Sequence, residues 1–280
     1  MGEIDSSLAS RRKALWLIGA AGLVALGADS AGAATTPRTA PPGTPLRLRP
    51  AVLPAPKPTP KPTPKPRPAP WSPAPLTALK PGEPIRHLAE LVPPAPPNTI
   101  ALTIDDGPHP EYTPRVLDLL AEHQVHATFF IIGEQIKDNA KLVERIAADG
   151  HQICNHTMTH PIAFDDVSKK RLKTEIAEPH DLIAQTTQIV PTLFRAPGGA
   201  WSPAVLDAVA EHDMLPIDWA VDPRDWARPG AARIRKALTK SKAGDILLVH
   251  DGGGDRAQTV SALRAAIPRL KKKGLSFVAL

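Results

Sequence analysis

The sequence is poor in cysteine and aromatic residues, and each shortage excludes a class of protein. Its 280 residues include one cysteine, Cys154, so the chain cannot form an internal disulfide. Aromatic residues make up 4% of the chain, and no basic stretch is interleaved with them, so nucleic acid is not the expected partner. No G-x-S-x-G sequence occurs, which disfavours a serine hydrolase with a nucleophile elbow. Because Cys154 follows Ile153 in an apolar stretch, we expect a small buried side chain there.

The chain also lacks a long apolar run. The longest, Ala14 to Ala28, is shorter than the roughly 20 residues of a comfortable membrane span. It follows three basic residues, Arg11-Arg12-Lys13, and precedes the small-residue pattern Ala31-Gly32-Ala33, so residues 1–34 are predicted to be an export signal. The signal is either of twin-arginine or of ordinary secretory type. We expect a secreted or wall-associated protein, with membrane contact only if this segment stays uncleaved as an anchor.

Proline is concentrated in one segment. Of 34 prolines, 22 lie in residues 35–97, where nine basic and two acidic side chains give a net charge of +7. Proline fixes φ and lacks an amide donor, so this segment is predicted to be a disordered, extended linker. Its charge favours attraction to an anionic cell wall. Ile85, Leu88 and Leu91 have helical spacing, and we expect them to dock on the domain formed by residues 98–280.

Residues 98–280 alternate between strand-like and helix-like segments. Apolar runs at 99–103, 127–132 and 246–249 are typical of buried strands. Helices are expected between them, with N-caps at Thr113, Ser168 and Ser202. Repeated strand–helix units indicate an α/β fold with a parallel sheet, either a barrel or an open sheet.

The polar residues that could carry chemistry follow predicted strands. Asp105 and Asp106 end the first strand and are followed by a turn at Gly107, so both carboxylates can reach one site. His156 and His160 follow another strand and could share a cation with a carboxylate, as zinc sites do. Either pattern alone is also typical of an ordinary polar turn or helix face.

Three further stretches have the same placement. Arg195-Ala196-Pro197-Gly198-Gly199 offers a guanidinium that could hold a carboxylate, beside glycines that allow close backbone approach. Asp222-Pro223-Arg224-Asp225-Trp226 and Leu247-Leu248-Val249-His250 place an acid and a histidine near strand ends. Each could equally be a turn or strand-end sequence.

Taken together and in this order, T-I-D-D-G-P, H-T-M-T-H, R-A-P-G-G, D-P-R-D-W and L-L-V-H closely resemble the motifs of the NodB-homology polysaccharide deacetylases, carbohydrate esterase family 4. The resemblance covers essentially all of residues 98–280 and implies a distorted (β/α) barrel. It also implies a role for each matching residue: Asp105 as catalytic base, Asp106, His156 and His160 as metal ligands, Arg195 orienting Asp105, Asp225 orienting His250 as catalytic acid, and Trp226 and Leu248 around the acetyl methyl group.

Two positions depart from the family pattern. Ile104 replaces a usual phenylalanine, which keeps the position apolar, and Gly198 replaces an aromatic residue of many members, which removes a surface for sugar stacking. The Gly198 N–H remains available to an oxyanion.

The resemblance implies a metal-dependent hydrolase that removes acetyl groups from the N-acetylglucosamine units of a cell-wall polysaccharide, with peptidoglycan as the first choice. The implied cofactor is one divalent ion, zinc in preference to cobalt or nickel. The alternatives are an acetylxylan or chitin-oligosaccharide deacetylase of the same family, or a catalytically silent wall-binding module.

Overall fold

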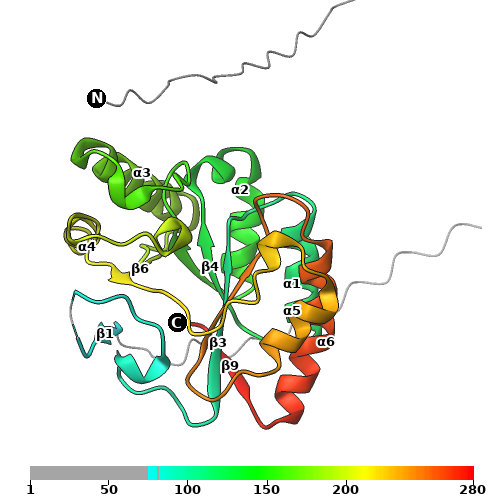
Figure 1. The fold of residues 1–280 in the computed structure, drawn as a ribbon. Helices are drawn as coiled ribbons and strands as arrows, with labels where there is room; N and C mark the ends of the chain where they lie inside the picture. Colours follow the sequence, from blue (N-terminus) through cyan, green and yellow to red (C-terminus); the bar gives the residue numbers. More distant parts are fainter. Residues whose placement is uncertain (1–74, 81) are drawn as a thin grey trace, which may run out of the picture. The chain divides into compact units, whose positions relative to one another are not determined.

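The computed structural model describes residues 75–80 and 82–280, in which a parallel sheet is surrounded by helices (Figure 1). The main sheet has seven strands in the order β7-β6-β5-β4-β3-β8, with β9 also paired to β3. Its strands are β3 (Thr99–Asp105), β4 (Thr128–Ile131), β5 (Gln152–Asn155), β6 (Leu193–Phe194), β7 (Leu215–Pro216), β8 (Ile246–His250) and β9 (Ser276–Val278). A separate antiparallel pair is formed by β1 (Thr77–Ala78) and β2 (Leu91–Val92).

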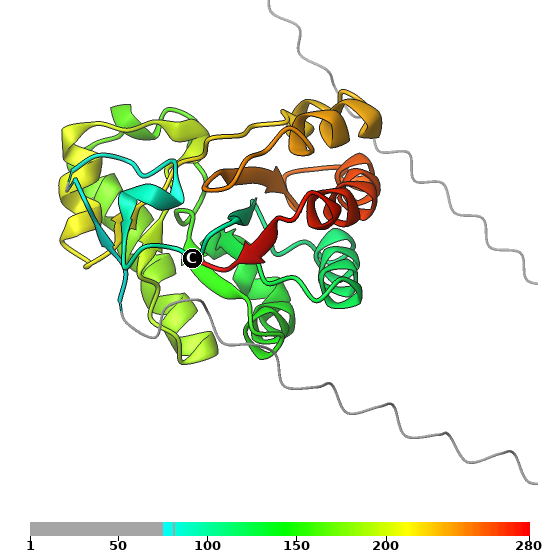
Figure 2. The same cartoon turned by 90° about the horizontal axis from the view of Figure 1, so that it is seen from below.

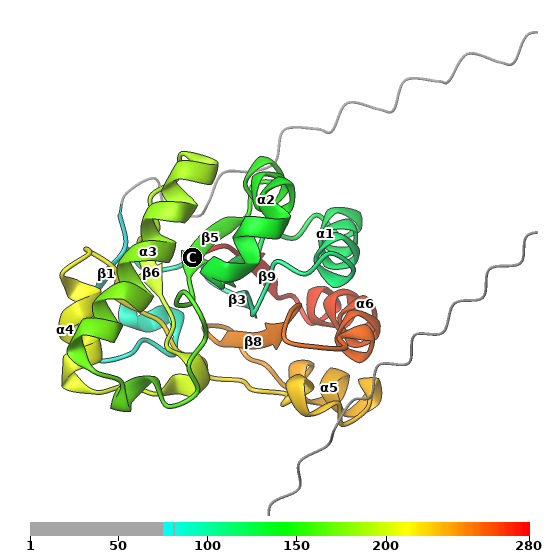
Figure 3. The same ribbon diagram turned by 90° about the horizontal axis from the view of Figure 1, so that it is seen from above.

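The helices connect successive strands on the outside of the curled sheet, as the views from below and above show (Figures 2 and 3). They are α1 (Tyr112–Glu122), α2 (Gly133–Ala148), α3 (Lys169–Thr187), α4 (Pro203–Ala210), α5 (Ala231–Leu238) and α6 (Ala257–Lys272). Short 3-10 turns occur at η1 (Leu88–Glu90), η2 (Phe164–Asp166), η3 (Pro197–Gly199) and η4 (Asp225–Ala227). This arrangement confirms the distorted barrel.

The core explains why the strands were recognisable. Every residue of β3, β4 and β8 is buried, since helices cover one side of the sheet and the barrel interior covers the other. One apolar cluster fills the space between the sheet and α1, α2, α5 and α6. A second cluster fills the barrel interior and includes Phe130, Ile246 and the fully buried Cys154, as predicted for this cysteine.

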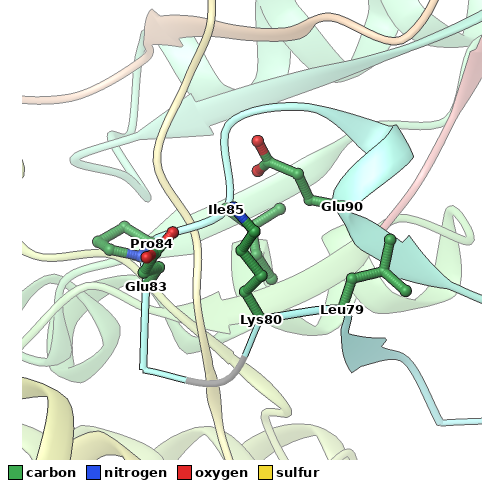
Figure 4. Close-up of a pocket in the computed structure, with 6 residues that line it drawn as sticks. All are labelled: Leu79, Lys80, Glu83, Pro84, Ile85 and Glu90. Atoms are coloured by element: carbon green, nitrogen blue, oxygen red, sulfur yellow. The ribbon is translucent and has the colours of Figure 1, made fainter.

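The segment before Asn98 closes the barrel. Ile85 pairs with Ile217, and His87 pairs with Asp245 next to β8, so the segment lies between the two ends of the sheet. Ile85, Leu88 and Leu91 are at most 2% exposed and belong to the interior cluster, which confirms that they dock on the domain. The loop between β1 and η1 also encloses a small pocket that only this segment lines (Figure 4): Leu79, Lys80, Glu83, Pro84, Ile85 and Glu90.

Residues 76–80 and 82–92 therefore pack on the domain, although their composition predicts that they belong to the linker. The predicted export signal at 1–34 and linker residues 35–74 lie outside the described residues. Among the residues described, no helix has the length and apolar character needed to cross a membrane.

The predicted N-caps had different outcomes. Ser168 and Ser202 accept hydrogen bonds from the amides of Arg171 and Val205, as expected. The prediction for Thr113 was wrong, because α1 begins at Tyr112, which places Glu111 at the N-cap position and Thr113 inside the helix. The Thr113 hydroxyl instead donates a hydrogen bond to the Asp251 carboxylate (2.6 Å).

We predict that removing the closing segment will destabilise the domain. Burying a leucine or isoleucine side chain stabilises a fold by about 1.5–3 kcal/mol, and three such side chains are involved. A chain beginning at Asn98 should lose about 4–9 kcal/mol of unfolding free energy relative to one beginning at Gly82, as an upper estimate. Urea unfolding of both chains measures the difference. Equal midpoints and slopes would show that residues 82–97 add nothing to the core.

Candidate active site

The five sequence motifs meet at the carboxyl ends of the parallel strands. Asp105 and His250 end the neighbouring strands β3 and β8 and are direct partners in the strand register. His156 follows β5, and Arg195 follows β6. Asp225 opens the turn η4, and its side chain bonds to His250. Ligand sites of α/β folds form at this edge of the sheet because the loops that follow the strands converge there.

Asp105 is held by a fully buried arginine. Arg195 Nη1 donates to Asp105 Oδ1 (2.7 Å) and to the Thr103 hydroxyl (2.7 Å). The remaining guanidinium nitrogens donate to the carbonyl oxygens of Ile217 (3.3 Å) and Asp218 (2.9 Å). Because these bonds fix the guanidinium on two sides, they fix the orientation of the Asp105 carboxylate as well.

Asp106 faces two histidines. Its Oδ1 lies 3.4 Å from His156 Nε2 and 3.3 Å from His160 Nε2. The His156 Nδ1 atom lies 2.8 Å from the Arg195 carbonyl oxygen. A carbonyl can only accept, so Nδ1 carries a hydrogen, and Nε2 is the ring nitrogen that remains to bind a cation. Burial lowers the pKa of His160, which favours a neutral ring there.

This cluster fits a divalent cation. One ligand atom from each of Asp106, His156 and His160 lies within 4.8 Å of the others. Asp106 Oδ1 is buried and has no hydrogen-bond donor among the described residues, although an unpaired buried oxygen is costly. Nitrogen and oxygen ligands about 2.0–2.2 Å from one tetrahedral ion are separated by distances similar to those seen here. One carboxylate and two imidazoles form a donor set that zinc accepts while keeping open positions.

The loop of residues 156–160, which we call the histidine loop, is held by residues outside its H-T-M-T-H motif. The buried Glu175 of α3 accepts hydrogen bonds from the Thr159 amide (2.8 Å) and the Thr159 hydroxyl (2.5 Å). Asn155 accepts from the Thr157 amide (2.9 Å) and donates to the Ile176 carbonyl (2.8 Å). Sequence reasoning missed Glu175 because its helical position gives no sign of a contact 16 residues upstream.

His250 forms an ion pair with a buried aspartate. Its Nδ1 lies 2.7 Å from Asp225 Oδ1, and its backbone N–H donates to Asp225 Oδ2 (2.9 Å). The Thr259 hydroxyl donates to the same oxygen (2.7 Å). Burial opposes protonation of His250, but the hydrogen bond and charge of Asp225 outweigh it and raise the pKa of His250 to about 9. The imidazole is therefore able to carry a proton at neutral pH.

The residues after His250 pack directly on the Asp105-Asp106 turn. The Asp251 amide donates to the Asp105 carbonyl (3.1 Å). A methyl group on Gly252 would overlap the Asp106 carbonyl, so only glycine allows this approach. Burial raises the pKa of Asp251 to about 7, although the Thr113 hydroxyl bond opposes the shift. The two strand ends are thus joined by backbone contacts as well as by register.

The predicted substrate-facing residues differ in exposure. Trp226 is 46% exposed, and the guanidinium of Arg224 lies 5.2 Å from its ring centre. Leu248 is 3% exposed in β8. Gly198 has a φ of +61°, and a side chain there would meet no atom within 4 Å. The backbone at this position is therefore open to an approaching ligand.

A carboxylate–histidine cluster that could hold a cation, beside an aspartate–histidine pair at the same sheet edge, is an arrangement suited to hydrolysis by a metal-activated water. The polysaccharide deacetylase family model matches residues 93–217. Together with the relatives described next, this match shows that the chain belongs to the polysaccharide deacetylase family, the NodB-homology group of carbohydrate esterase family 4. The resemblance noted in the sequence is thereby confirmed.

Two relatives are deacetylases with named substrates. The chain is 44% identical over 182 residues to a peptidoglycan-N-acetylglucosamine deacetylase of Bacillus cereus. The aligned region covers 64% of this chain and 84% of the relative. It is 42% identical over 189 residues to a chitooligosaccharide deacetylase of Rhizobium leguminosarum bv. trifolii, and this aligned region covers 63% of this chain and 87% of the relative.

Two solved structures bear on the fold and on its use. A peptidoglycan N-acetylglucosamine deacetylase in complex with 4-naphthalen-1-yl-N-oxidanyl-benzamide has a TM-score of 0.63 and 36% identity, covering 65% of this chain and 86% of that one. A CE4 family pseudoenzyme from Bacillus anthracis has a TM-score of 0.60 and 28% identity, covering 64% of this chain and 63% of that one. The fold alone therefore does not establish activity, and the side chains of the site have to carry that conclusion.

Proposed function

We propose that this chain is an active, metal-dependent deacetylase that cleaves the acetamido group of N-acetylglucosamine units in peptidoglycan. The observation that carries the proposal is the meeting, at one sheet edge, of a cation-binding cluster, a carboxylate fixed by Arg195 and an imidazole paired with Asp225. A silent wall-binding module would not need all three sets of contacts. The polysaccharide deacetylase family supplies the reaction class.

In the proposed reaction, Asp105 takes a proton from the attacking water. Arg195 supports this role by holding Asp105 Oδ1 so that the other oxygen, Oδ2, faces His156 and the cation cluster (3.8 Å from His156 Nε2). Because Arg195 is itself bonded to backbone carbonyls, the carboxylate is oriented before substrate binds. A bound divalent cation, held by Asp106, His156 and His160, would make the water more acidic and polarise the acetyl carbonyl.

The oxyanion formed by the attack requires hydrogen-bond donors. The open backbone at Gly198 supports its N–H as one of them. Leu248 and Trp226 are assigned to the acetyl methyl group, since both adjoin the His250 strand end and offer apolar surface.

The amine is a poor leaving group and needs a proton. We assign the donor as His250, because the raised pKa keeps its ring protonated at neutral pH. Asp225 holds Nδ1, which leaves Nε2 as the atom that delivers the proton. Acid and base therefore belong to neighbouring strands and act on opposite ends of the breaking bond.

Peptidoglycan is preferred over chitin oligomers because of the chain upstream of the domain. The predicted export signal and the basic, proline-rich segment of residues 35–97 suit an enzyme that works within a cell wall. The relatives named for chitooligosaccharides keep the second substrate class open. We propose that the protein is exported, and fractionation of the producing cells would overturn this if the protein stayed entirely with the cytoplasmic proteins.

A substrate panel tests the proposed function. Acetate is measured after the protein is incubated with peptidoglycan, N-acetylglucosamine oligomers or acetylated xylan, with Asp105→Asn protein as the blank. We expect release from the two N-acetylated substrates, fastest from peptidoglycan, and at least tenfold less from xylan. Release from xylan alone would identify an O-acetyl esterase, and no release from any substrate would support the silent module.

A further inference from the structure

The charge of the described domain is divided between two regions of the chain. No aspartate or glutamate occurs in residues 226–244 or 256–280, and these two stretches contain twelve lysines and arginines. Residues 98–225 have the opposite balance, with twenty acidic and ten basic side chains. The near-neutral total of the domain therefore hides a strongly basic part.

Packing brings the two basic stretches together. They form α5 and α6, which lie side by side on the opposite flank from α3 and α4 (Figure 3). A shallow hollow of about 440 Å³ lies between these helices. Four of its lining side chains are cationic and none is a carboxylate; the lining residues are Ala232, Arg233, Arg235, Lys236, Thr239 and Arg269. We call this hollow with its rim the basic groove.

The cations of the basic groove lack acidic partners. Within the described residues, Arg233, Arg235 and Lys236 form no side-chain hydrogen bond or ion pair. Several arginines elsewhere on the domain surface are matched by carboxylates, as Arg115 is by Glu111 and Arg145 by Asp118. Unpaired cations that face one hollow repel each other, so an anionic ligand would relieve a cost that the fold leaves in place.

Helix stability does not explain this distribution. Cations in the last turn of a helix interact favourably with its dipole, and acids do so in the first turn. Both helices have basic last turns, but neither has an acid in its first turn. Arg233 lies near the start of α5, where the dipole disfavours a cation. The surface is thus basic from end to end.

The spacing favours a chain-like ligand over a small ion. Arg233 and Lys236 lie three residues apart in α5, which places their side chains on one side of the helix. Arg269 lines the same hollow from α6, so its cations are spread over two helices and are not gathered at one point. Guanidinium groups, which predominate among the lining cations, match the paired oxygens of a phosphodiester.

Other polyanionic partners fit less well. A membrane-binding surface needs exposed apolar side chains. The large exposed apolar side chains of the described residues all precede α5 in the sequence: Leu79, Val92, Ile162, Val190 and Trp226. Recognition of single-stranded nucleic acid needs aromatic stacking, and residues 227–276 contain no phenylalanine, tyrosine or tryptophan.

We propose that the basic groove of α5 and α6 binds a linear polymer that carries phosphodiester groups. Binding there holds the domain on the polymer and leaves the catalytic cluster at the strand ends free. The proposal does not depend on the proposed deacetylation, because binding and acetate release are measured separately.

The test compares two triple variants of the full chain that remove the same charge. The groove variant loses three cations of the basic groove through Arg233→Gln, Lys236→Gln and Arg269→Gln. The control variant loses three exposed lysines of α2 and α3 through Lys137→Gln, Lys141→Gln and Lys170→Gln. Binding of fluorescent poly(glycerol phosphate) is followed by anisotropy over a range of salt concentrations. We expect the groove variant to bind at least tenfold more weakly and with a smaller salt slope, and the control less than twofold more weakly.

Acetate release from a soluble N-acetylglucosamine oligomer should be the same in both variants and in the unmodified protein. Equal weakening in the two variants would show that only net charge matters and would overturn the proposal. Equal affinity of the unmodified protein for polygalacturonate of matched charge, whose anionic groups are carboxylates, would overturn the assignment to phosphodiesters.

Discussion

Replacing either histidine of the cation cluster should abolish activity and bound metal together. His156→Ala removes an imidazole whose Nε2 faces Asp106, and His160→Ala removes its partner. Even residues that only support a metal ligand typically contribute 10–100-fold to affinity or activity, so loss of a ligand should cost more than a hundredfold. Metal content is measured by mass spectrometry of purified protein, and activity by acetate release.

His212→Ala provides a control in which a histidine outside the cluster is lost. This variant should keep both metal and activity. Full metal occupancy in His156→Ala and His160→Ala, in protein that unfolds at the same temperature as the unmodified chain, would remove the basis for a metal site at Asp106.

Loss of the His250 imidazole should affect amide and ester substrates differently. Cleavage of an amide needs a proton on the departing nitrogen, whereas an activated acetyl ester has a leaving group that needs little assistance. General acid catalysis contributes about 10²–10⁴-fold, so His250→Ala should lower the rate on an N-acetyl substrate by that factor and on the ester by much less. Equal losses on both substrates at unchanged metal content would exclude His250 as the proton donor.

The pH profile of the same pair gives a second readout. The hydrogen bond and charge of Asp225 raise the pKa of His250, so His250 loses its proton only well above neutral pH. Asp225→Asn removes that charge, and the basic limb of kcat/KM should move to lower pH while the acidic limb stays in place. Each limb belongs to a coupled system, so the shift between variants is the informative quantity. An unmoved basic limb would contradict the assigned role of Asp225.

The sequence was sufficient where a contact was local or repeated. Strands β4 and β8 could be predicted because a strand covered on both sides is apolar at every position. The five motifs could be placed at one edge because parallel strands end together. The family resemblance then suggested roles for residues such as Asp105 and His250, which strand patterns alone could not provide.

Contacts between distant segments could not be predicted in this way. The Thr113 hydroxyl bonds to Asp251, 138 residues away, although its sequence neighbours suggested a helix cap. Glu175 of α3 supports the histidine loop, and Thr259 of α6 supports Asp225. The sequence patterns of these two helices give no sign of either contact. The basic groove was missed because summing charge over the whole domain cancelled two opposite regions.

The measurement that tests the central claim most directly is the rate of acetate release by Asp105→Asn protein from an N-acetylglucosamine oligomer. The substitution keeps the shape of the side chain but removes its ability to accept a proton, and it leaves Asp106, His156 and His160 in place. We predict that the variant binds metal as the unmodified protein does and is at least a hundredfold slower, the lower range for loss of a general base. A metal-loaded Asp105→Asn protein with a rate within threefold of the unmodified protein would contradict the account.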